Sequence, residues 1–377
     1  MTASHAAAGS LDVAVVGAGL YGATIARELA RRGRHVTLIE REDGLLRRAS
    51  IFNQARVHGG YHYPRSLQTG VRSQLNYRRF VRDYSAAVDP AIRSVYAIAR
   101  VGSRVTGAQF ARFCERIDAP VERIPGPGPI AMDGGMIEAA YLVREATFDA
   151  VRLASILEAD LADAAVDVVF STSVERIDSA AGEIVLFVNG PHGRSRTAAR
   201  DVVVCAYAGT NALLERSGLP ALPLRYQDTE MVLVKLPRTF EGLAVTVMDG
   251  PYFSVLPYPT RPGLHTLSHV RFTPRVRHVQ GAAVDEHEMR RSELSAFPYM
   301  ITDARRYVPD LGAAIYIESI REAKVFPATA DQNDGRPILI HRSAEIPGLQ
   351  IVVGGKIDNV YDIADELQPS VSDGRPA

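Results

Sequence analysis

Two short apolar runs near the start of the chain flank a segment with helical periodicity. Residues 12–16 (DVAVV) and 35–40 (HVTLIE) are typical of buried strands, because they are short and rich in β-branched side chains. Between them, residues 20–32 place Ile25 and Leu29 on one helical face. The order predicts a strand–helix–strand unit within the first 40 residues.

Later apolar runs predict further strands in separate groups. The first group is expected at residues 166–170, 174–177, 184–188 and 202–206. A second group, separated by prolines and typical of antiparallel strands, is expected at residues 230–236, 252–256 and 266–272. A last strand at 350–353 and a closing helix at 359–367 complete the pattern. The α/β material is therefore expected in discontinuous pieces around a β-rich insertion.

Composition and charge disfavour several classes of protein. The 377 residues exceed one ordinary domain of about 150, so at least two domains are expected. Lys+Arg and Asp+Glu both count 43, which argues against binding nucleic acid through an overall basic field. The two cysteines, Cys114 and Cys205, cannot form a disulfide framework, and no apolar stretch reaches the roughly 20 residues of a membrane span. These features predict a reduced, cytoplasmic protein with no nucleic-acid partner and no membrane span.

The strand–helix–strand unit carries a dinucleotide-binding fingerprint. Gly17, Gly19 and Gly22 form G-x-G-x-x-G at the turn into the helix, and Glu40 ends the second strand. The first glycine permits the tight turn, the second lets the backbone approach a pyrophosphate, and the third allows close helix packing. The helix N-terminus attracts phosphate, and Glu40 can accept hydrogen bonds from ribose hydroxyls. Because the chain has one such fingerprint, it favours FAD without a separate nicotinamide site.

Four segments resemble the D-amino acid oxidase and glycine oxidase superfamily of FAD-dependent oxidoreductases. Besides the fingerprint, they are residues 49–65 (ASIFNQARVHGGYHYPR), 202–211 (VVVCAYAGTN) and 347–361 (PGLQIVVGGKIDNVY). The histidine–glycine pattern of 49–65 is closer to L-2-hydroxyglutarate and glycerol-3-phosphate dehydrogenases. The resemblance implies a discontinuous Rossmann-like FAD domain at 1–85, 146–215 and 325–377. The inserted, mainly antiparallel β substrate domain would cover 86–145 and 216–324.

The resemblance also implies which residues contact FAD. Gly59 would let backbone N–H groups approach the flavin ring, and Lys356 would stabilise the negative charge of the reduced flavin. The expected FAD-binding residues are Gly17, Gly19, Gly22, Glu40, Arg41, Ser50, Asn53, Gln54, Ala55, Arg56, His58, Gly59, Val174, Ala206, Gly209, Gly354, Gly355, Lys356 and Ile357.

The sequence specifies the substrate-binding residues less closely than the FAD-binding residues. We expect His58 beside the flavin and Tyr252 in the cavity wall, while His269 and Arg271 share one face of a strand by their period of two. The family's Arg-Pro pair is replaced at its expected place by Phe326-Pro327. The candidates for an arginine or lysine that holds a substrate anion are therefore Arg271, Arg321, Lys324 and Arg336.

Two H-x-x-x-H pairs are present but predict no metal site. His58 and His62 flank two glycines, which are poor helix formers, and His265 and His269 would lie about 13 Å apart on a strand. Neither pair has the glutamate of the H-E-x-x-H zinc motif.

The resemblance implies hydride transfer from a substrate carbon to flavin N5. The expected substrate is a small amino acid or another amine, which would give an imine. One alternative is a 2-hydroxy-acid dehydrogenase, in which His58 or His269 would take the hydroxyl proton. A second alternative is an FAD-binding partner protein without turnover. The electron acceptor, oxygen or another compound, stays open.

Overall fold

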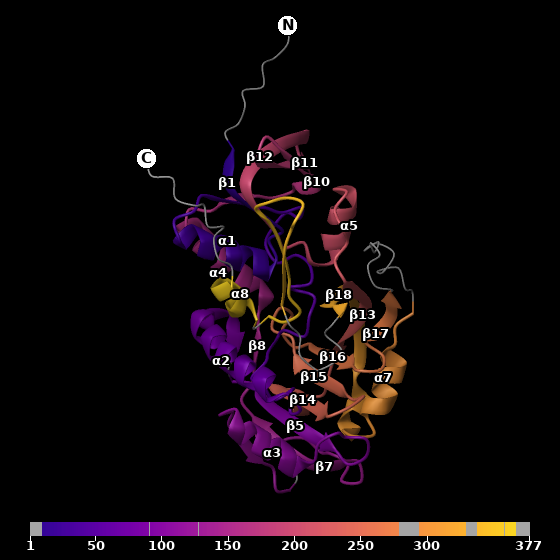
Figure 1. Ribbon diagram of the computed structural model, residues 1–377. Coiled ribbons are helices and arrows are strands. Elements are labelled where there is room, and N and C mark those ends of the chain that lie inside the picture. Colours follow the sequence, from indigo (N-terminus) through magenta and orange to yellow (C-terminus); the bar gives the residue numbers. More distant parts are fainter. Residues whose placement is uncertain are drawn as a thin grey trace.

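Two large β-sheets and a small one form the framework of the computed structural model (Figure 1), which describes residues 10–89, 91–126, 128–278, 294–328, 338–357 and 359–366. Within these residues the first sheet has eight strands, the second has nine and the small one has three. In Figure 1 the first sheet lies in the upper part and the second in the lower part.

The first sheet is parallel where it carries the predicted fingerprint. Its centre is β1 (Leu11–Val16), which pairs in parallel with β2 (Val36–Ile39) and β12 (Gly193–Val204). Its other strands are β9 (Asp167–Val169), β10 (Ser173–Ala180), β11 (Glu183–Gly190), β19 (Leu339–Arg342) and β20 (Leu349–Val353). Strand β20 runs parallel to β12 although about 150 residues separate them in the sequence. The sheet is therefore assembled from distant segments, as the discontinuous pattern predicted.

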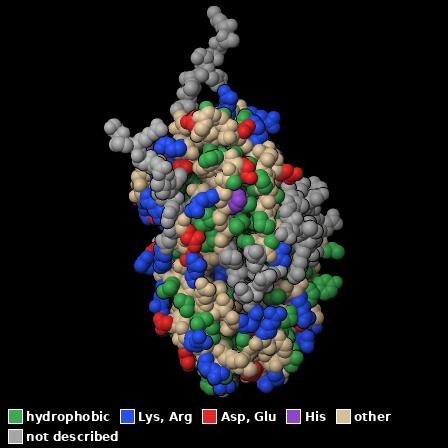
Figure 2. All heavy atoms as spheres, in the orientation of Figure 1, with side chains coloured by type: hydrophobic (Ala, Val, Ile, Leu, Met, Phe, Trp, Pro, Cys, Tyr) green, Lys and Arg blue, Asp and Glu red, His purple; other side chains and the backbone are tan. Residues whose placement is uncertain are grey.

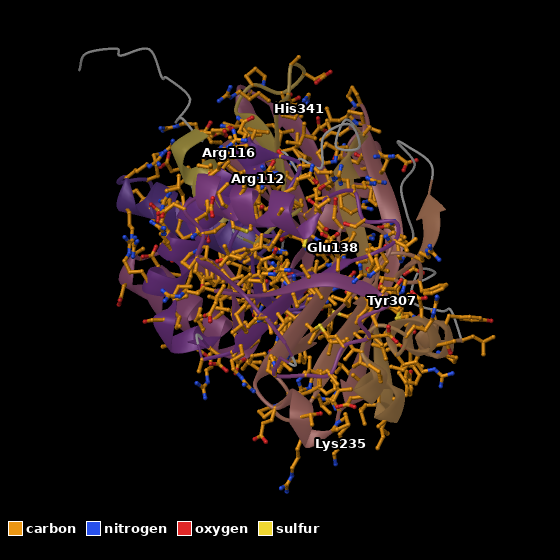
Figure 3. The ribbon with its side chains drawn as sticks, turned by 90° about the horizontal axis from the view of Figure 1, so that it is seen from below. Arg112, Arg116, Glu138, Lys235, Tyr307 and His341 are labelled. Atoms are coloured by element: carbon orange, nitrogen blue, oxygen red, sulfur yellow. The ribbon has the colours of Figure 1, made fainter. Side chains whose placement is uncertain are left out.

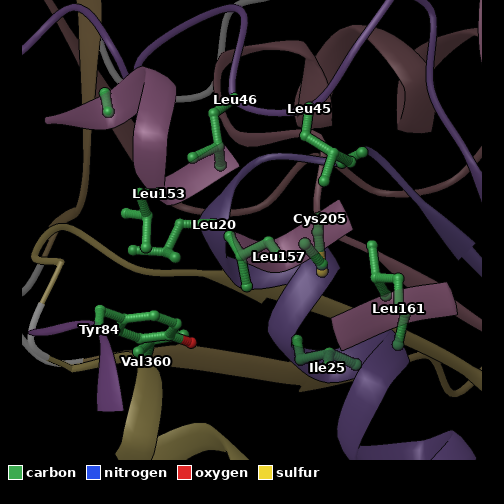
Figure 4. Packing of buried hydrophobic residues seen from close by; sticks show 14 of the residues in the cluster. Leu20, Ile25, Leu45, Leu46, Tyr84, Leu153, Leu157, Leu161, Cys205 and Val360 are labelled. Carbon is green, nitrogen blue, oxygen red and sulfur yellow. The ribbon is translucent and has the colours of Figure 1, made fainter. Parts of the chain in front are cut away.

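Helices cover both faces of this sheet. On one face, α1 (Leu20–Arg31), α4 (Ala150–Asp163) and α8 (Val360–Glu366) pack together. The buried side chains of Ile25, Leu157 and Leu161 meet there (Figure 4). Arg27 of α1 forms a 2.5 Å ion pair with Asp160 of α4, which fixes the two helices against each other. The other face packs against α5 (Thr210–Arg216).

The second sheet is mainly antiparallel. Its strands are β5 (Arg93–Ala99), β6 (Val121–Arg123), β7 (Ile137–Val143), β13 (Leu224–Lys235), β14 (Leu243–Met248), β15 (Phe253–Pro257), β16 (His265–His269), β17 (Pro274–His278) and β18 (Ile315–Pro327). The pair β5–β14 is parallel. Helices α3 (Gly107–Arg116) and α7 (Phe297–Ala304) pack on it. Seen from below, Arg112 and Arg116 lie along α3, and Lys235 points away from the molecule (Figure 3).

Strand β18 joins the two sheets. It pairs with β13 along the whole of β13, from Leu224 to Lys235. Near its end, Ala323 and Val325 are buried in the core that also contains Ile177 and Leu186 of the first sheet. The end of β18 therefore packs against the nucleotide-binding part of the fold.

The small sheet connects the N-terminal part of the chain with the inserted part. Its strands are β3 (Arg56–Val57), β4 (Val88–Asp89) and β8 (Ala146–Phe148), and helix α2 (Leu67–Asp83) lies between β3 and β4 in the sequence. In the antiparallel pair of β3 and β8, Arg56 lies opposite Thr147 and Val57 opposite Ala146.

The predicted fold class is confirmed, while several strands end earlier than expected. The strand predicted at 266–272 ends at His269 because the chain turns there. The backbone N–H of Thr273 donates to the carbonyl of His269, and the Thr273 hydroxyl accepts from the His269 N–H. The exact domain limits stay a prediction. Figure 2 shows basic and acidic side chains over both the upper and lower parts of one face, in keeping with the zero net charge.

Candidate functional site

A cavity of about 730 Å³ lies where the carboxyl ends of the parallel strands meet. Val16, Ile39 and Val352, near the ends of three strands of the first sheet, line it, and so do Cys205 and Ala206 after β12. Open α/β sheets bind their ligands at this edge. The cavity is therefore the place where the fingerprint would act.

The glycine loop brings backbone to the cavity wall. Gly17 has φ +100°, and a Cβ there would lie 2.7 Å from the carbonyl oxygen of Cys205. Gly19 also lines the cavity, next to the Ser50 hydroxyl. A Cβ on Gly22 would lie 1.8 Å from the carbonyl oxygen of Gly17, so this glycine lets helix α1 approach the loop rather than lining the cavity.

The acid at the end of β2 faces the glycine loop. The Glu40 carboxylate accepts hydrogen bonds from the backbone N–H groups of Ala18, at 2.5 Å, and Glu42, at 2.9 Å. Glu40 is buried and lines the cavity together with Arg41. Its orientation is thus fixed before any ligand binds, and a ribose hydroxyl can still donate to a carboxylate oxygen.

The segment after the second strand wraps around the start of α1. The Ser50 hydroxyl accepts from the Leu20 N–H at 3.0 Å. The Asn53 side chain donates to the Ser50 carbonyl at 2.6 Å and accepts from the Ala55 N–H at 2.7 Å. Ser50 and Asn53 line the cavity, while Ala55 is buried behind it.

The C-terminal wall of the cavity is tightly packed. A Cβ on Gly354 would lie 2.2 Å from a ring carbon of Tyr21, whose hydroxyl donates to the Lys356 carbonyl at 2.5 Å. The Lys356 side chain is buried, and its ammonium lies 3.7 Å from the centre of the Tyr63 ring. This wall would approach a bound ligand with backbone and with one positive charge.

The residues present fit a dinucleotide. The cavity combines a glycine turn at a helix start with a buried acid at the end of the next strand, as the fingerprint requires. The Nε2 atom of Gln54 is buried without a hydrogen-bond partner among the described residues, but Gln54 does not line the cavity.

The structure divides the expected FAD-binding residues into two groups. The group that lines the cavity is Gly17, Gly19, Glu40, Arg41, Ser50, Asn53, Val174, Ala206, Gly209, Gly354, Gly355, Lys356 and Ile357. The group outside its lining is Gly22, Gln54, Ala55, Arg56, His58 and Gly59. Contact of either group with a cofactor stays a prediction.

His58 lies beyond the Lys356 end of the cavity, in a cluster of polar aromatic side chains. Its ring centre is 5.6 Å from that of His62 and 5.9 Å from that of Tyr63. Its Nδ1 atom is 3.8 Å from Oε1 of Glu145. The side chain of His58 is 24% exposed, whereas that of Glu145 is only 3% exposed. Tyr63 connects this cluster to the cavity, because Lys356 lies over its ring.

Tyr252, His269 and Arg271 do not line the cavity. The Tyr252 hydroxyl donates to the carbonyl of Val101, so this tyrosine closes a loop instead. The Nε2 atom of His269 lies 3.0 Å from Asp303, and burial lowers the pKa of this histidine. Arg271 is exposed in the turn after β16, so the predicted shared face with His269 is wrong.

Of the candidate anion-binding residues, some line the cavity and others do not. Lys324 lines the cavity from β18, as do Glu322 and Phe326 at the alternating positions. Arg321 faces away, and its guanidinium lies 3.6 Å from the buried carboxylate of Glu230. Arg336 lies outside the described residues.

Several residues at the site were not expected from the sequence, among them Tyr21, Glu322 and Glu145. Tyr21 follows the glycine turn inside the fingerprint, and its position there was the available signal. Glu145 carried no signal of its own, because its place depends on strand pairing.

Neither cysteine has the properties of a reactive thiol. Cys114 and Cys205 are buried and unpaired in a disulfide, and burial raises the pKa of each to about 12. In the described ranges, no group of three or more His, Cys, Asp or Glu side chains could hold a metal ion. The helices of that same part of the chain are all too short or too polar to cross a membrane.

Known proteins resemble the chain in sequence and in fold. The family model for FAD dependent oxidoreductases matches residues 12–356. The FAD-dependent monooxygenase FPY4 of Fusarium mangiferae is 30% identical over 265 residues, which are 70% of this chain and 65% of that protein. The chain therefore spans less than two thirds of this relative's length.

Solved structures of the same fold cover nearly the whole chain. Glycine oxidase from Geobacillus kaustophilus is similar with a TM-score of 0.67 and 19% identity, over 95% of both chains. L-α-glycerophosphate oxidase from Mycoplasma pneumoniae, with FAD bound, has a TM-score of 0.72 and 16% identity, over 95% of this chain and 94% of that one. These findings confirm the resemblance drawn from the four segments.

Proposed function

The chain belongs to the FAD-dependent oxidoreductase family, and on that premise we propose that it oxidises a small polar substrate at a carbon that carries a hydroxyl group. The protein is an FAD-dependent enzyme by its family; the hydroxyl-bearing substrate is the proposed part. The observation that carries this part is the position of His58, whose ring lies 5.9 Å from the Tyr63 ring that contacts Lys356 of the cavity wall, and whose Nδ1 lies 3.8 Å from a buried carboxylate.

The residues of the cavity suggest how FAD would lie. Glu40 and Arg41 would hold the adenosine end, the glycine loop and the start of α1 would hold the pyrophosphate, and Gly354 to Ile357 would lie along the flavin. When bound, FAD supplies an acceptor for a hydride at N5 of its ring. This orientation leaves the His58 cluster at the flavin end.

Oxidation of an alcohol releases a proton as well as a hydride. The C–H bond breaks with its electron pair, the O–H proton must leave, and the carbon–oxygen bond becomes double. A histidine beside the substrate can take that proton, which contributes about 10²–10⁴-fold to the rate. His58 has the residue type, the partial exposure and the neighbouring carboxylate for this role.

Oxidation of an amine is the second candidate function. Its support is the similarity in fold to glycine oxidase, whose name gives an amino acid as substrate. A neutral amine that loses a hydride gives a protonated imine directly, and water then converts the imine to a carbonyl compound. That reaction needs no base in the hydride step, so it leaves the position of His58 unexplained.

The absorption spectrum of the bound flavin separates the candidates. The holoenzyme would be mixed without oxygen with a pool of 2-hydroxy acids and polyols, and separately with a pool of amino acids and amines. We expect the hydroxyl pool to bleach the flavin band, and we expect His58→Gln to slow that bleaching about 10²–10⁴-fold. Bleaching by the amine pool alone, at the same rate in His58→Gln, would establish the second candidate instead.

A third outcome is a flavin that stays oxidised with both pools. Dithionite is the control, because it shows whether the bound flavin can be reduced at all. A flavin that dithionite reduces and no pool compound reduces would favour the FAD-binding partner protein without turnover.

A further inference from the structure

We propose that Glu145 is the positioning residue of His58. Its buried carboxylate lies 3.8 Å from Nδ1, which is an ion-pair distance rather than a hydrogen-bond distance, so its charge would favour an imidazole that presents a protonated Nδ1 to Glu145 and Nε2 to the substrate. The inference rests on the proposed function, because it assigns a partner to the same base.

Strand register places the two residues opposite each other. In the antiparallel pair β3–β8, Arg56 lies opposite Thr147 and Val57 opposite Ala146. Continuing this register by one pair brings His58 opposite Glu145. The backbone N–H of Gly59 also donates to Oε1 of Glu145 at 3.2 Å. The backbone, rather than a flexible loop, therefore sets the distance between the carboxylate and the histidine.

The carboxylate of Glu145 is held on its far side as well. Its Oε2 atom accepts from the Tyr96 hydroxyl at 2.9 Å and lies 3.6 Å from Nη1 of Arg56. Burial raises the pKa of Tyr96 well above its ordinary value, so the phenol remains a donor. A buried carboxylate is costly unless such partners compensate it, and the Tyr96 hydroxyl and the Arg56 guanidinium are placed to do so.

Arg56 anchors this arrangement to the second sheet. Its guanidinium donates to the Tyr96 hydroxyl on β5 at 2.9 Å and to the Thr246 hydroxyl on β14 at 2.8 Å. The two carboxylate oxygens of Glu145 thus have different surroundings. Oε2 belongs to the ion pair and the tyrosine, whereas Oε1 faces Gly59 and His58. The hydrogen bond from the Gly59 N–H thus holds Oε1 on the side of Glu145 where Nδ1 of His58 lies.

The charges around His58 are asymmetric. Glu145 places a negative charge on the Nδ1 side at 3.8 Å, while His62 and Tyr63 lie against the ring and Lys356 lies beyond Tyr63. When His58 accepts a proton, the imidazolium gains the attraction of the nearer carboxylate. The geometry therefore favours the neutral imidazole that is protonated at Nδ1 before the proton transfer. It also favours the imidazolium that is present after the transfer.

The decisive variant is Glu145→Gln combined with Arg56→Gln, which removes both charges of the buried pair and so leaves neither uncompensated. The protonation of His58 would be followed in the holoenzyme by NMR, with histidine ring carbons labelled and the His58 signal assigned by its loss in His58→Gln. We expect the His58 midpoint to move to lower pH by about one pH unit, because the nearer negative charge is lost. This measurement needs no substrate.

Activity gives the second readout, on the pool compound that bleaches the wild-type flavin fastest. We expect the double variant to lose about 10–100-fold in the rate of anaerobic reduction, with its acidic limb displaced to lower pH. In a protein that already carries His58→Gln, the same two changes should not lower the rate of flavin reduction further, since they act through His58.

The outcomes separate this inference from the proposed function. A folded double variant with an unmoved His58 midpoint and wild-type rate would overturn the role of Glu145 while leaving the role of His58 intact. A wild-type rate in His58→Gln would instead overturn the proposed function. If the double variant unfolds, Tyr96→Phe replaces it, since it keeps both charges and removes one hydrogen bond to Glu145. A small rate loss that vanishes in the His58→Gln background would then support the positioning role, and an unchanged rate would refute it.

Discussion

Replacement of Gly354 by alanine should weaken FAD binding, because the wall of the cavity has no room for one more methyl group. An ideal Cβ at this position lies 2.2–2.3 Å from three atoms at the end of the Tyr21 ring. Ordinary carbon contacts begin at about 3.5 Å, so the ring or the strand must move by about 1.3 Å. Both Gly354 and Tyr21 line the cavity, so either movement changes its shape.

The magnitude follows from the two ways of relieving the clash. If the Tyr21 ring moves, its hydrogen bond to the Lys356 carbonyl is lost, at a cost of about 0.5–1.5 kcal/mol. If the strand moves instead, overpacking costs about 1–3 kcal/mol. A loss of about 0.5–3 kcal/mol in binding free energy raises the dissociation constant of FAD about 2- to 150-fold.

Titration of the apoprotein with FAD, followed by quenching of flavin fluorescence, measures this effect. Gly134→Ala is the matched control, because a Cβ there meets nothing within 4 Å. Tyr21→Leu removes the end of the ring, so Gly354→Ala should lower the affinity for FAD much less in the Tyr21→Leu protein than in the wild type. Wild-type affinity in Gly354→Ala, or an equal loss in both backgrounds, would refute the reasoning.

Three further predictions test stability and protonation. Leu157→Ala should lower the free energy of unfolding by about 2–5 kcal/mol, because it opens a cavity between α1 and α4; urea denaturation with an unchanged m-value checks this, and exposed Val151→Ala should change little. The native protein at pH 8 should resist a thiol reagent until it unfolds, since burial raises the pKa of Cys114 and Cys205 to about 12; rapid labelling of native protein would contradict this. Burial lowers the pKa of His269, so below about pH 6.5 the unfolded chain binds more protons and stability falls. His269→Gln should therefore lose less melting temperature than the wild type between pH 7.5 and 5.5, and an equal loss would argue against a neutral buried imidazole.

Local patterns predicted the nucleotide-binding part of the fold closely. The helix expected at 20–32 is Leu20–Arg31, and the strand expected at 35–40 is Val36–Ile39. In this unit the glycines, the apolar runs and the acid all lie within 30 residues. Their separations in the sequence therefore determine which of them lie close together in space. The cavity-lining residues close to these elements in the sequence could be predicted for the same reason.

Strand β18 shows why other parts were not predicted. Its residues Glu322 and Lys324 are charged but line a cavity, so the strand lacks the alternation of a buried and a solvated face. Helix α4 had a readable pattern, with Leu153, Leu157 and Leu161 four residues apart, yet it was not expected. The spacing of these leucines is sufficient to predict a helix with one buried face.

Residues that act through pairing across long sequence distances could not be predicted from this single sequence. Glu145 meets His58 only because β3 and β8 pair in one register, and a slip of one residue would turn the carboxylate away. Likewise, His269 and Arg271 share a face only if the strand continues, whereas the backbone and the Thr273 hydroxyl close a turn directly after His269.

The construction of the first sheet has a consequence for biosynthesis. Strands β1 and β2 leave the ribosome early, but β20, which pairs with Val202 to Val204 of β12, follows roughly 310 residues after β2. At about 5–20 residues per second, that interval lasts about 15–60 s. During this time the growing chain exposes an apolar strand edge, which is a template for misassembly. Because residues 354–357 complete the cavity wall, the expected FAD site is complete only after this interval. FAD added during synthesis is therefore expected to stabilise only those chains that have been extended past residue 357.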